Sequence, residues 1–247
     1  MNGLLKQLLD ASRARAEETV DKAAASRPSF RDAIAGRDEL SVIAEFKRRS
    51  PSSPVLAPAA ALAPSLQRYV TGGAHAVSVV TEPTRFGGAL ADVCGAAACC
   101  PLPILRKDFL VLPQQIEVAA TAGASAVLLI ARALNDASLD ELLHAASVRG
   151  LDVLLECHDQ VDLNRALARD VLIGINNRDL DTLRVDLGNV LRLLPQIPDD
   201  RVVVAESGYE TAAQVREVTG RVDAVLVGTA LMRGGSIASL VEQESKT

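Results

Sequence analysis

Short hydrophobic runs alternate with amphipathic stretches from about residue 41 to the end of the chain. Each run is almost continuously apolar, as parallel strands that are buried on both faces should be. The runs recur every ~20–35 residues, which is the spacing of repeated strand–loop–helix units. The pattern predicts eight strands, which are Ser41–Phe46, Ala76–Thr81, Pro103–Lys107, Ala126–Ala131, Asp152–Glu156, Val171–Asn176, Arg201–Glu206 and Asp223–Gly228.

The segments between these runs are predicted to be helices. Residues 138–141 have the pattern of a capping box and open a helix that we expect to end at Gly150. Residues 211–214 have the same pattern and open a helix that we expect to end at Gly220. Strands and helices therefore alternate along the chain.

Residues 1–40 precede the first strand, and residues 4–24 within them have helical periodicity. The segment is too short to form a core of its own. We therefore expect an N-terminal helical extension packed on the main fold. Because the core belongs to the alternating units, we also expect that fold to survive deletion of residues 1–35.

Eight β/α units in 247 residues predict an α/β fold, the (β/α)8 TIM barrel with an N-terminal helical extension. We expect one domain over residues 1–247, with the extension in 1–40 and the eight units in 41–247. The alternative is an open doubly wound sheet. Such a sheet usually carries a glycine-rich phosphate-binding turn after its first strand, and SVIAEFKRRSPSS contains no glycine.

Composition narrows the classes of partner. Hydrophobic residues make up 49% of the chain, which is enough for a large core. The net charge of −5 argues against nucleic acid, because no basic surplus neutralises phosphates, but a local cationic pocket for a small anion fits it. Without a run of about eighteen apolar residues or a signal-peptide core, we expect a cytoplasmic protein with no membrane partner.

The cysteines and histidines give no sign of a metal site. The four cysteines contain no C-x-x-C pair, and the three histidines lack metal-ligand spacing. Cys157 and His158 are adjacent, but neighbours on a strand point to opposite faces. We therefore expect small buried cysteines and no bound metal.

Polar residues stand at the carboxyl ends of the predicted strands, where barrel enzymes carry their active sites. Because side chains alternate along a strand, residues two apart share a face. The polar residues at these ends include Glu45, Lys47, Lys107, Glu156, Asn176 and Glu206. One interpretation is a ring of ion pairs that plugs the barrel mouth. Burying charges at five strand ends is costly unless they pair or bind a ligand, which favours a functional site.

Two short turns predict a phosphate site. Ser207 and Gly208 follow the seventh strand, and Gly228 and Thr229 follow the eighth. Barrel enzymes commonly hold a phosphate there, and glycine lets the backbone approach an anion. A helix that begins at Thr229 would point its N–H groups at the same place.

The strand-end motifs together resemble the indole-3-glycerol-phosphate synthase family. AEFKRRSPS, TEPTRFGG, LRKDF, LLECH, GINNRDL, AESG and VGTALM follow one another in the order and spacing of that family from about Ile43 to Met232. The N-terminal helical extension is also similar to that of the family, whose members use it to cover part of the site. The set is highly specific, whereas any one motif would not be.

The resemblance implies a cofactor-free ring closure of 1-(2-carboxyphenylamino)-1-deoxyribulose 5-phosphate, with loss of carbon dioxide and water. It implies that Lys107 is the general acid and that Glu156 serves the dehydration step. Lys47 would contact the anionic groups of the substrate, and its charge would lower the pKa of Lys107. Glu45 and Asn176 would orient these groups and the substrate hydroxyls.

The resemblance also implies the residues that bind the substrate. The phosphate would lie against the two turns at 207–208 and 228–229, with Lys47 and Ser50 near it. Arg178 would steer the anionic substrate, or else pair with a loop carboxylate. For Leu128 and Ile130, barrel packing is the alternative to substrate contact. The residues matched to the family's substrate site are Ser50, Phe86, Phe109, Leu128, Ile130, Arg178, Leu180 and Glu206.

One loop departs from the family pattern. Pro54 and Pro58 stand where a glycine or lysine and an acidic residue are more usual, and they should stiffen the loop after the first strand. Turnover would then differ if motion of that loop limits the rate. The matched catalytic positions are intact, so the departure does not imply loss of activity.

Two other functions fit a barrel with these residues. In a Schiff-base aldolase acting on a phosphorylated sugar, Lys107 would be the nucleophile. In a non-catalytic barrel, the same pocket would bind a phosphorylated sugar without turnover. In each case the partner is a small phosphorylated molecule, and we expect a monomer or weak homo-oligomer without cofactor.

Overall fold

The structure is a computed structural model that describes residues 3–20, 27–51, 56–57 and 60–241. In this part of the chain, eight parallel strands close into a barrel in sequence order, and β8 pairs with β1. The predicted (β/α)8 fold is confirmed, and the open doubly wound sheet is wrong. The strands are β1 (Ser41–Phe46), β2 (Ala76–Val80), β3 (Ile104–Lys107), β4 (Ala126–Ile130), β5 (Asp152–Cys157), β6 (Leu172–Asn176), β7 (Val203–Glu206) and β8 (Ala224–Val227).

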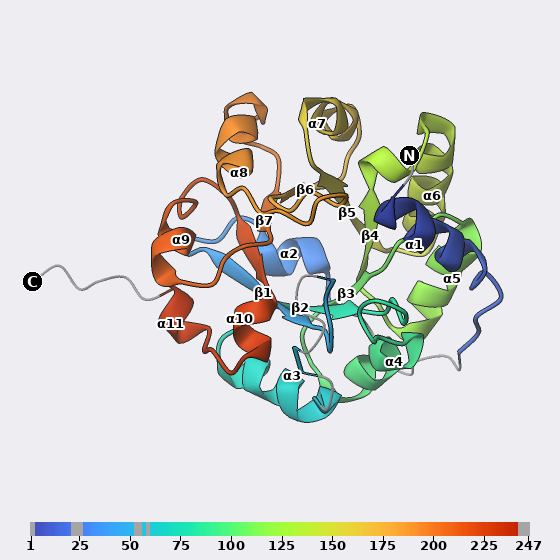
Figure 1. Cartoon of the computed structure of the whole chain (residues 1–247), viewed down its shortest axis with the longest axis horizontal. Helices are drawn as coiled ribbons and strands as arrows, with labels where there is room; N and C mark the ends of the chain where they lie inside the picture. Colours follow the sequence, from blue (N-terminus) through green and yellow to red (C-terminus); the bar gives the residue numbers. More distant parts are fainter. Residues whose placement is uncertain (1–2, 21–26, 52–55, 58–59, 242–247) are drawn as a thin grey trace, which may run out of the picture.

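Helices surround the barrel and cover the outer face of its strands (Figure 1). The N-terminal extension contributes α1 (Leu4–Arg13) and α2 (Phe30–Ile34). The other helices are α3 (Leu62–Thr71), α4 (Leu90–Cys99), α5 (Pro113–Ala122), η1 (Ala131–Ala133), α6 (Asp136–Val148), α7 (Gln160–Leu167), α8 (Gly188–Leu193), η2 (Leu194–Gln196), α9 (Ala212–Arg216), α10 (Thr229–Met232) and α11 (Ala238–Val241).

The strands are buried on both faces, as their continuous hydrophobic runs predict. Every residue of β1, β2 and β4 is buried. Inward side chains fill the barrel, and outward ones pack against the helices. The predicted and observed ends differ by one or two residues. In β3, for example, Pro103 lies outside the strand, and its ring leaves no N–H for a ladder bond.

Two helix boundaries correct the sequence prediction. Helix α6 begins at Asp136, because the Asn135 side chain caps it by accepting the Ser138 N–H at 2.8 Å. The capping box predicted to begin at Ser138 is therefore wrong. The box from Thr211 to Gln214 is confirmed at α9. That helix ends before Gly220, because the following residues pass into tight turns such as the bond from Val218 N–H to Val215 O.

The N-terminal helix α1 is shorter than its periodicity predicts. It ends at Arg13, and Arg15 then forms a bidentate pair with Asp108, with both N–O distances at 2.9 Å. Asp108 lies just after β3, and its side chain is fully buried. The extension is thus fastened to the carboxyl end of a barrel strand. Residues 21–24, the end of the predicted helix, lie outside the described residues.

Helix α2 closes the opposite end of the barrel. Phe30 and Ile34 are completely buried. The N–H groups of Phe30 and Arg31 donate to Asp152 at the start of β5, and the Ser41 hydroxyl at the start of β1 donates to the Ile34 carbonyl. Figure 1 shows α2 across the centre of the ring of strands. The extension therefore has two parts that serve different ends of the barrel.

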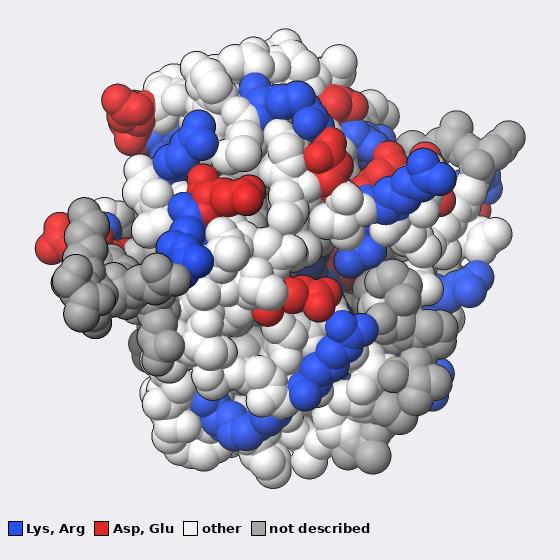
Figure 2. Space-filling view, turned by 60° about the vertical axis from the view of Figure 1, so that its left-hand side comes forward, with Lys and Arg blue, Asp and Glu red and all other residues white. Residues whose placement is uncertain are grey.

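The surface carries charges of both signs. On the face seen in Figure 2, basic and acidic side chains are interspersed, and neither sign forms a continuous surface. Within the described ranges, no helix combines the length and the apolar character that crossing a bilayer requires. The same residues contain no group of three or more side chains suited to hold a metal ion.

Candidate active site

The carboxyl ends of the strands surround a pocket with about 1080 Å³ of empty space, its open mouth included. Nearly every residue singled out in the sequence lines this one pocket. Glu206 lies beneath it, 1% exposed, and contacts Lys107 from below. The predicted residues that line the pocket are Glu45, Lys47, Ser50, Phe86, Lys107, Phe109, Leu128, Ile130, Glu156, Asn176, Arg178, Leu180, Ser207, Gly208, Gly228 and Thr229.

Strand register places Glu156 and Glu206 on the two strands that flank β6. Asn176 on β6 pairs with Glu206 on β7, and Glu156 on β5 pairs with Gly174 on β6. A Cβ built on Gly174 would overlap Oε1 of Glu206. The glycine on β6 therefore makes room for a carboxylate from the neighbouring strand.

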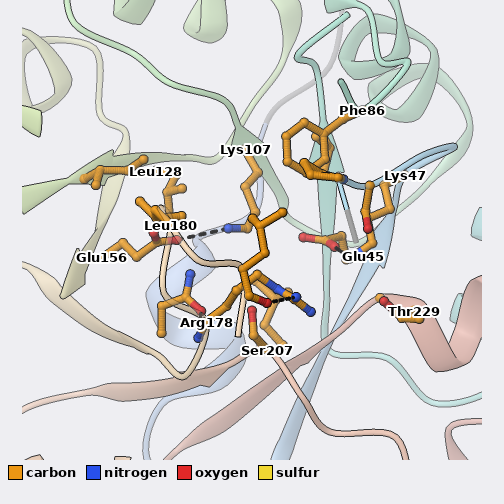
Figure 3. Close-up of a pocket in the computed structure, with 18 of the residues that line it drawn as sticks. Glu45, Lys47, Phe86, Lys107, Leu128, Glu156, Arg178, Leu180, Ser207 and Thr229 are labelled. Atoms are coloured by element: carbon orange, nitrogen blue, oxygen red, sulfur yellow. Dashed lines mark hydrogen bonds and ion pairs between the residues drawn. The ribbon is translucent and has the colours of Figure 1, made fainter. Parts of the chain in front are cut away.

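Lys107 lies at the centre of the charged residues. Its Nζ donates to Oε2 of Glu156 at 3.1 Å and lies 3.2 Å from Oε2 of Glu206. In Figure 3, Lys107 stands between Glu156 on one side and the pair of Glu45 and Lys47 on the other. The Lys107 side chain is 18% exposed and lines the pocket, whereas the side chains of Glu156 and Glu206 are almost fully buried.

The protonation states follow from these contacts. Burial lowers the pKa of Lys107, but the carboxylates of Glu156 and Glu206 outweigh it and hold that pKa above its usual range. The expectation that Lys47 lowers this pKa is wrong. Lys47 is paired with Glu45 at 2.6 Å, and the anions beside Lys107 dominate. Lys107 is therefore an ammonium group in the resting protein.

The two carboxylates beside Lys107 differ. Burial alone raises the pKa of Glu156, but Lys107 and His158 outweigh it and hold the pKa well below its usual range. Burial raises the pKa of Glu206 to about 7, because Lys107 only partly offsets it and the charge of Glu156 adds to the rise. The pocket thus has one carboxylate that stays ionised and one that takes up a proton near neutral pH.

Lys47 and Glu45 form a second ion pair against the turn after β8. Their side chains are 14% and 4% exposed. A Cβ built on Gly228 would overlap Oε1 of Glu45 and approach Nζ of Lys47 to 2.9 Å. Gly228 is therefore needed for space, which places the backbone of this turn directly against the lysine.

The two turns predicted to hold phosphate line the same pocket as this pair. Ser207 and Gly208 both have left-handed backbones, with φ of 66° and 91°. Such a conformation is strained for serine and points to a functional constraint. Helix α10 begins at Thr229, as predicted. Ser50 is buried at the pocket edge, whereas Pro54 and Pro58 lie outside the described residues.

Apolar side chains also line the pocket. The rings of Phe86 and Phe109 lie 6.2 Å apart at a tilt of 41°. Glu82 shapes the loop that carries Phe86, because its carboxylate accepts the N–H groups of Thr84, Arg85 and Phe86. Leu128 and Ile130 belong to the barrel core and also line the pocket, so their packing role is confirmed and substrate contact stays a prediction.

Arg178 lies at the mouth, between the apolar part and the two turns. Its Nη1 donates to the Leu183 carbonyl at 2.8 Å, and its own N–H donates to Oδ1 of Asn176 at 2.9 Å. Burial lowers the pKa of Arg178. The guanidinium is thus held by a loop carbonyl while its side chain lines the pocket (Figure 3).

Other pocket residues were not singled out in the sequence. Leu4, Leu5 and Leu8 of α1 add an apolar cover to the mouth, and their spacing is that of one helix face. Their spacing on one helix face is present in the sequence, but it predicts only that the leucines are packed and does not predict that they line a pocket. Leu183, Tyr209 and Glu210 also line the pocket and directly neighbour the predicted motifs.

Comparisons with known proteins identify the family. The sequence profile of indole-3-glycerol phosphate synthase matches residues 5–243. The chain belongs to the indole-3-glycerol phosphate synthase family. The protein of that name from Opitutus terrae is 44% identical over 225 residues, covering 87% of this chain and 84% of its own length. The synthase from a Parafrankia species is 42% identical over 243 residues, covering 94% of this chain and 91% of its own length.

Solved structures outside the synthase family share the barrel. The N-acetylmannosamine-6-phosphate 2-epimerase from Clostridium perfringens has a TM-score of 0.62 at 13% identity, covering 85% of this synthase-family chain and 93% of its own. Phosphoribosylanthranilate isomerase from Thermotoga maritima has a TM-score of 0.57 at 17% identity, covering 81% and 94%. These likenesses show the fold alone. The family resemblance predicted from the strand-end motifs is confirmed by the synthase profile.

Proposed function

We propose that the protein closes the ring of 1-(2-carboxyphenylamino)-1-deoxyribulose 5-phosphate in tryptophan biosynthesis. The products are indole-3-glycerol phosphate, carbon dioxide and water, which makes the protein a carboxy-lyase. Family membership supports this reaction. The observation that carries it is the Lys107 ammonium, which contacts two buried carboxylates and faces a pocket lined by both charged and apolar side chains.

Lys107 is the proposed general acid. During ring closure, the aromatic carbon that bears the carboxylate bonds to the ketone carbon, and the ketone oxygen gains negative charge. An ammonium group at the pocket floor donates a proton to that oxygen. The carboxyl group then leaves as carbon dioxide, and the electrons of the broken bond restore the aromatic ring.

Glu156 is the proposed carboxylate for the dehydration step. After decarboxylation, the former ketone oxygen leaves as water, and a ring proton is lost to form the indole. An ionised carboxylate next to Lys107 accepts that proton. Glu45 and Asn176 orient Lys47 and Glu156, and Glu206 holds Lys107 from below.

The two ends of the substrate differ in chemistry, and the pocket is lined by both polar and apolar groups. We assign the phosphate to the turns at 207–208 and 228–229, with Lys47 and Ser50 beside it. We assign the aromatic ring to the apolar side chains of Phe86, Phe109, Leu128, Ile130 and Leu180. We assign Arg178 to the anionic groups of the substrate.

A Schiff-base aldolase is disfavoured by the charge state of Lys107. A lysine that attacks a carbonyl must be a neutral amine, which a lowered pKa provides. Burial does lower the pKa of Lys107, but the two carboxylates raise it above its usual range. The same ammonium group suits an acid, so the ring-closing reaction fits the site better.

Incubation of the purified protein with the carboxyphenylamino-deoxyribulose phosphate tests the proposal. We expect indole fluorescence to appear without added cofactor or metal. Borohydride added during turnover should leave no covalent adduct on Lys107. A trapped adduct would support the aldolase, and tight binding without product would support the non-catalytic barrel.

We further propose a single-domain protein that works in the cytoplasm as a monomer or weak homo-oligomer. Its small phosphorylated substrate fits the size of the pocket. Cys99 is exposed and Cys157 is buried, each as a thiol, which fits a reducing compartment. Sedimentation of the purified protein at several concentrations tests the oligomeric state.

A further inference from the structure

A buried histidine lies behind Glu156, on the side away from the pocket floor. His158 follows Glu156 by two residues at the end of β5, so both side chains turn to the same side. Nε2 of His158 lies 3.2 Å from Oε1 of Glu156, and the ring is 4% exposed. The two oxygens of Glu156 thus have separate partners, because Oε2 accepts from Lys107.

The other edge of the His158 ring faces a second carboxylate. Nδ1 lies 3.7 Å from Oδ2 of Asp162, which is 4% exposed. Oδ2 of Asp162 also accepts the N–H of His158 and Nε of Arg132, each at 3.0 Å. Asp162 belongs to the first turn of α7 and is therefore fixed by the helix as well as by these bonds.

These groups form a line of alternating charge from the surface to the pocket. Arg132 follows β4 and is 26% exposed, and it also contacts the helix-capping Asp159 at 2.9 Å. The line then runs through Asp162, His158 and Glu156 to Lys107. The elements that carry it are η1, α7, β5 and β3.

The surroundings of His158 favour the form that carries both ring protons. Both ring nitrogens are buried without a hydrogen-bond partner among the described residues, and each lies within ion-pair distance of a carboxylate oxygen. A neutral ring has one bare nitrogen, whose lone pair would then face an anion. Burial and Arg132 lower the pKa of His158, but Asp162 and Glu156 raise it to about 9. An imidazolium therefore places a positive charge between the two carboxylates at neutral pH.

We propose that His158 is a positioning residue for Glu156, acting as a buried cation that holds one oxygen of this carboxylate and leaves the other to Lys107 and the substrate. This role rests on the proposed function of Glu156. The charge of His158 keeps Glu156 ionised, so that it is ready to accept a proton. Asp162 and Arg132 hold the histidine in place from the outer side.

Histidine NMR tests the charge state without any assay of activity. The chain has three histidines, His75, His144 and His158. His75→Gln and His144→Gln each remove one signal, so the third is assigned without altering the site. We expect the His158 signal to stay in the charged form at about pH 7 and to titrate near pH 9. A signal that is neutral at about pH 7 overturns the proposal.

Kinetics of His158→Gln tests the effect on Glu156. Glutamine retains an N–H donor near the position of Nε2 but carries no charge. We expect kcat to fall by about ten- to hundredfold, with KM changed less than threefold. The acid limb of the kcat profile should move up by about one pH unit or more, because Glu156 loses a nearby cation.

His144→Gln is the matched control, because His144 is exposed on α6 and is not part of the charged line. Its profile should equal that of the unaltered protein. A folded His158→Gln protein with an unchanged acid limb overturns the proposed role. If the unaltered protein makes no indole while His158 titrates near pH 9, the proposed function fails and the charge assignment stands.

Discussion

At the scale of single residues, the charge of Lys107 determines when it can donate a proton. Its pKa lies above the usual range, whereas a general acid works best with a pKa near the working pH. The lysine therefore keeps its proton in the resting site and yields it only to a strongly basic oxygen. The ketone oxygen becomes such a base as the new carbon–carbon bond forms.

Lys107→Met tests the acid. Methionine keeps the length of the side chain without its charge, so we expect kcat to fall by about two to four orders of magnitude. Two carboxylates lose their buried partner, which should lower the free energy of unfolding by about 3–5 kcal/mol. Steady-state turnover measures kcat, and urea unfolding measures the free energy of unfolding. Lys6→Met, on the exposed Lys6 of α1, should change neither value.

The Glu206→Gln variant tests the raised pKa of Glu206, about 7, through the pH dependence of the free energy of unfolding. Because the folded state holds this proton more tightly, the stability of the unaltered protein falls as pH rises from about 4.5 to about 7, by about 3 kcal/mol. Glutamine cannot lose a proton, so the variant should gain stability relative to the unaltered protein across this range. Urea unfolding near pH 5 and near pH 8 measures the difference. A constant difference between the two proteins contradicts the raised pKa.

The sequence predicted which charged residues gather at the strand ends, but it did not predict which of them form ion pairs with one another. The alternation of side chains gave Glu45 and Lys47 a common face, and the structure joins them at 2.6 Å. Which carboxylates reach Lys107 depends on the register of β5, β6 and β7, which no local pattern reveals. For this reason the direction of the pKa shift at Lys107 was predicted wrongly.

At the scale of elements, the turn after β8 must lie close to the barrel interior. Gly228→Ala places a methyl group against Glu45 and Lys47, so the backbone or the ion pair must shift. We expect KM to rise about tenfold or more, which corresponds to about 1.4 kcal/mol of lost binding. Gly188→Ala is the control, because at α8 the added methyl group meets the exposed side chains of Arg192 and Asp186, which can move away, whereas Glu45 and Lys47 are largely buried. Equal KM values for the two variants contradict the role of this turn.

Helix ends were harder to predict than strands. The strands are fixed by burial on both faces, which a continuous hydrophobic run reveals directly. A helix start depends on which of several polar side chains reaches a free N–H, and Asn135 does so ahead of Ser138. A helix end depends on tertiary partners, as when Arg15 turns away from α1 to Asp108.

At the scale of the whole molecule, the extension covers both ends of the barrel. Leucines of α1 cover the mouth, and α2 fills the far end. A protein that starts at residue 27 keeps α2, so it should fold and bind substrate about tenfold or more weakly. A protein that starts at residue 36 loses Phe30 and Ile34, each worth about 2–5 kcal/mol in a core, and should not fold stably.

Because Phe30 and Ile34 are completely buried, this prediction differs from the expectation that the barrel survives deletion of residues 1–35. Thermal unfolding measures the stability of the two shortened proteins, and KM of the protein that starts at residue 27 measures its loss of substrate binding. The sequence indicated an extension too short for its own core, but it did not show that Phe30 belongs to the barrel. A stable fold from residue 36 onward contradicts the role of α2.

The central claim is that this pocket joins ring closure to loss of the carboxyl group. The most direct measurement uses substrate labelled at the carboxyl carbon and counts carbon dioxide and indole product in one reaction. We predict one molecule of carbon dioxide for each indole ring, and in the Lys107→Met protein we predict that both form more slowly by the same factor. Indole without labelled carbon dioxide, or neither product from the unaltered protein, would contradict the proposed function.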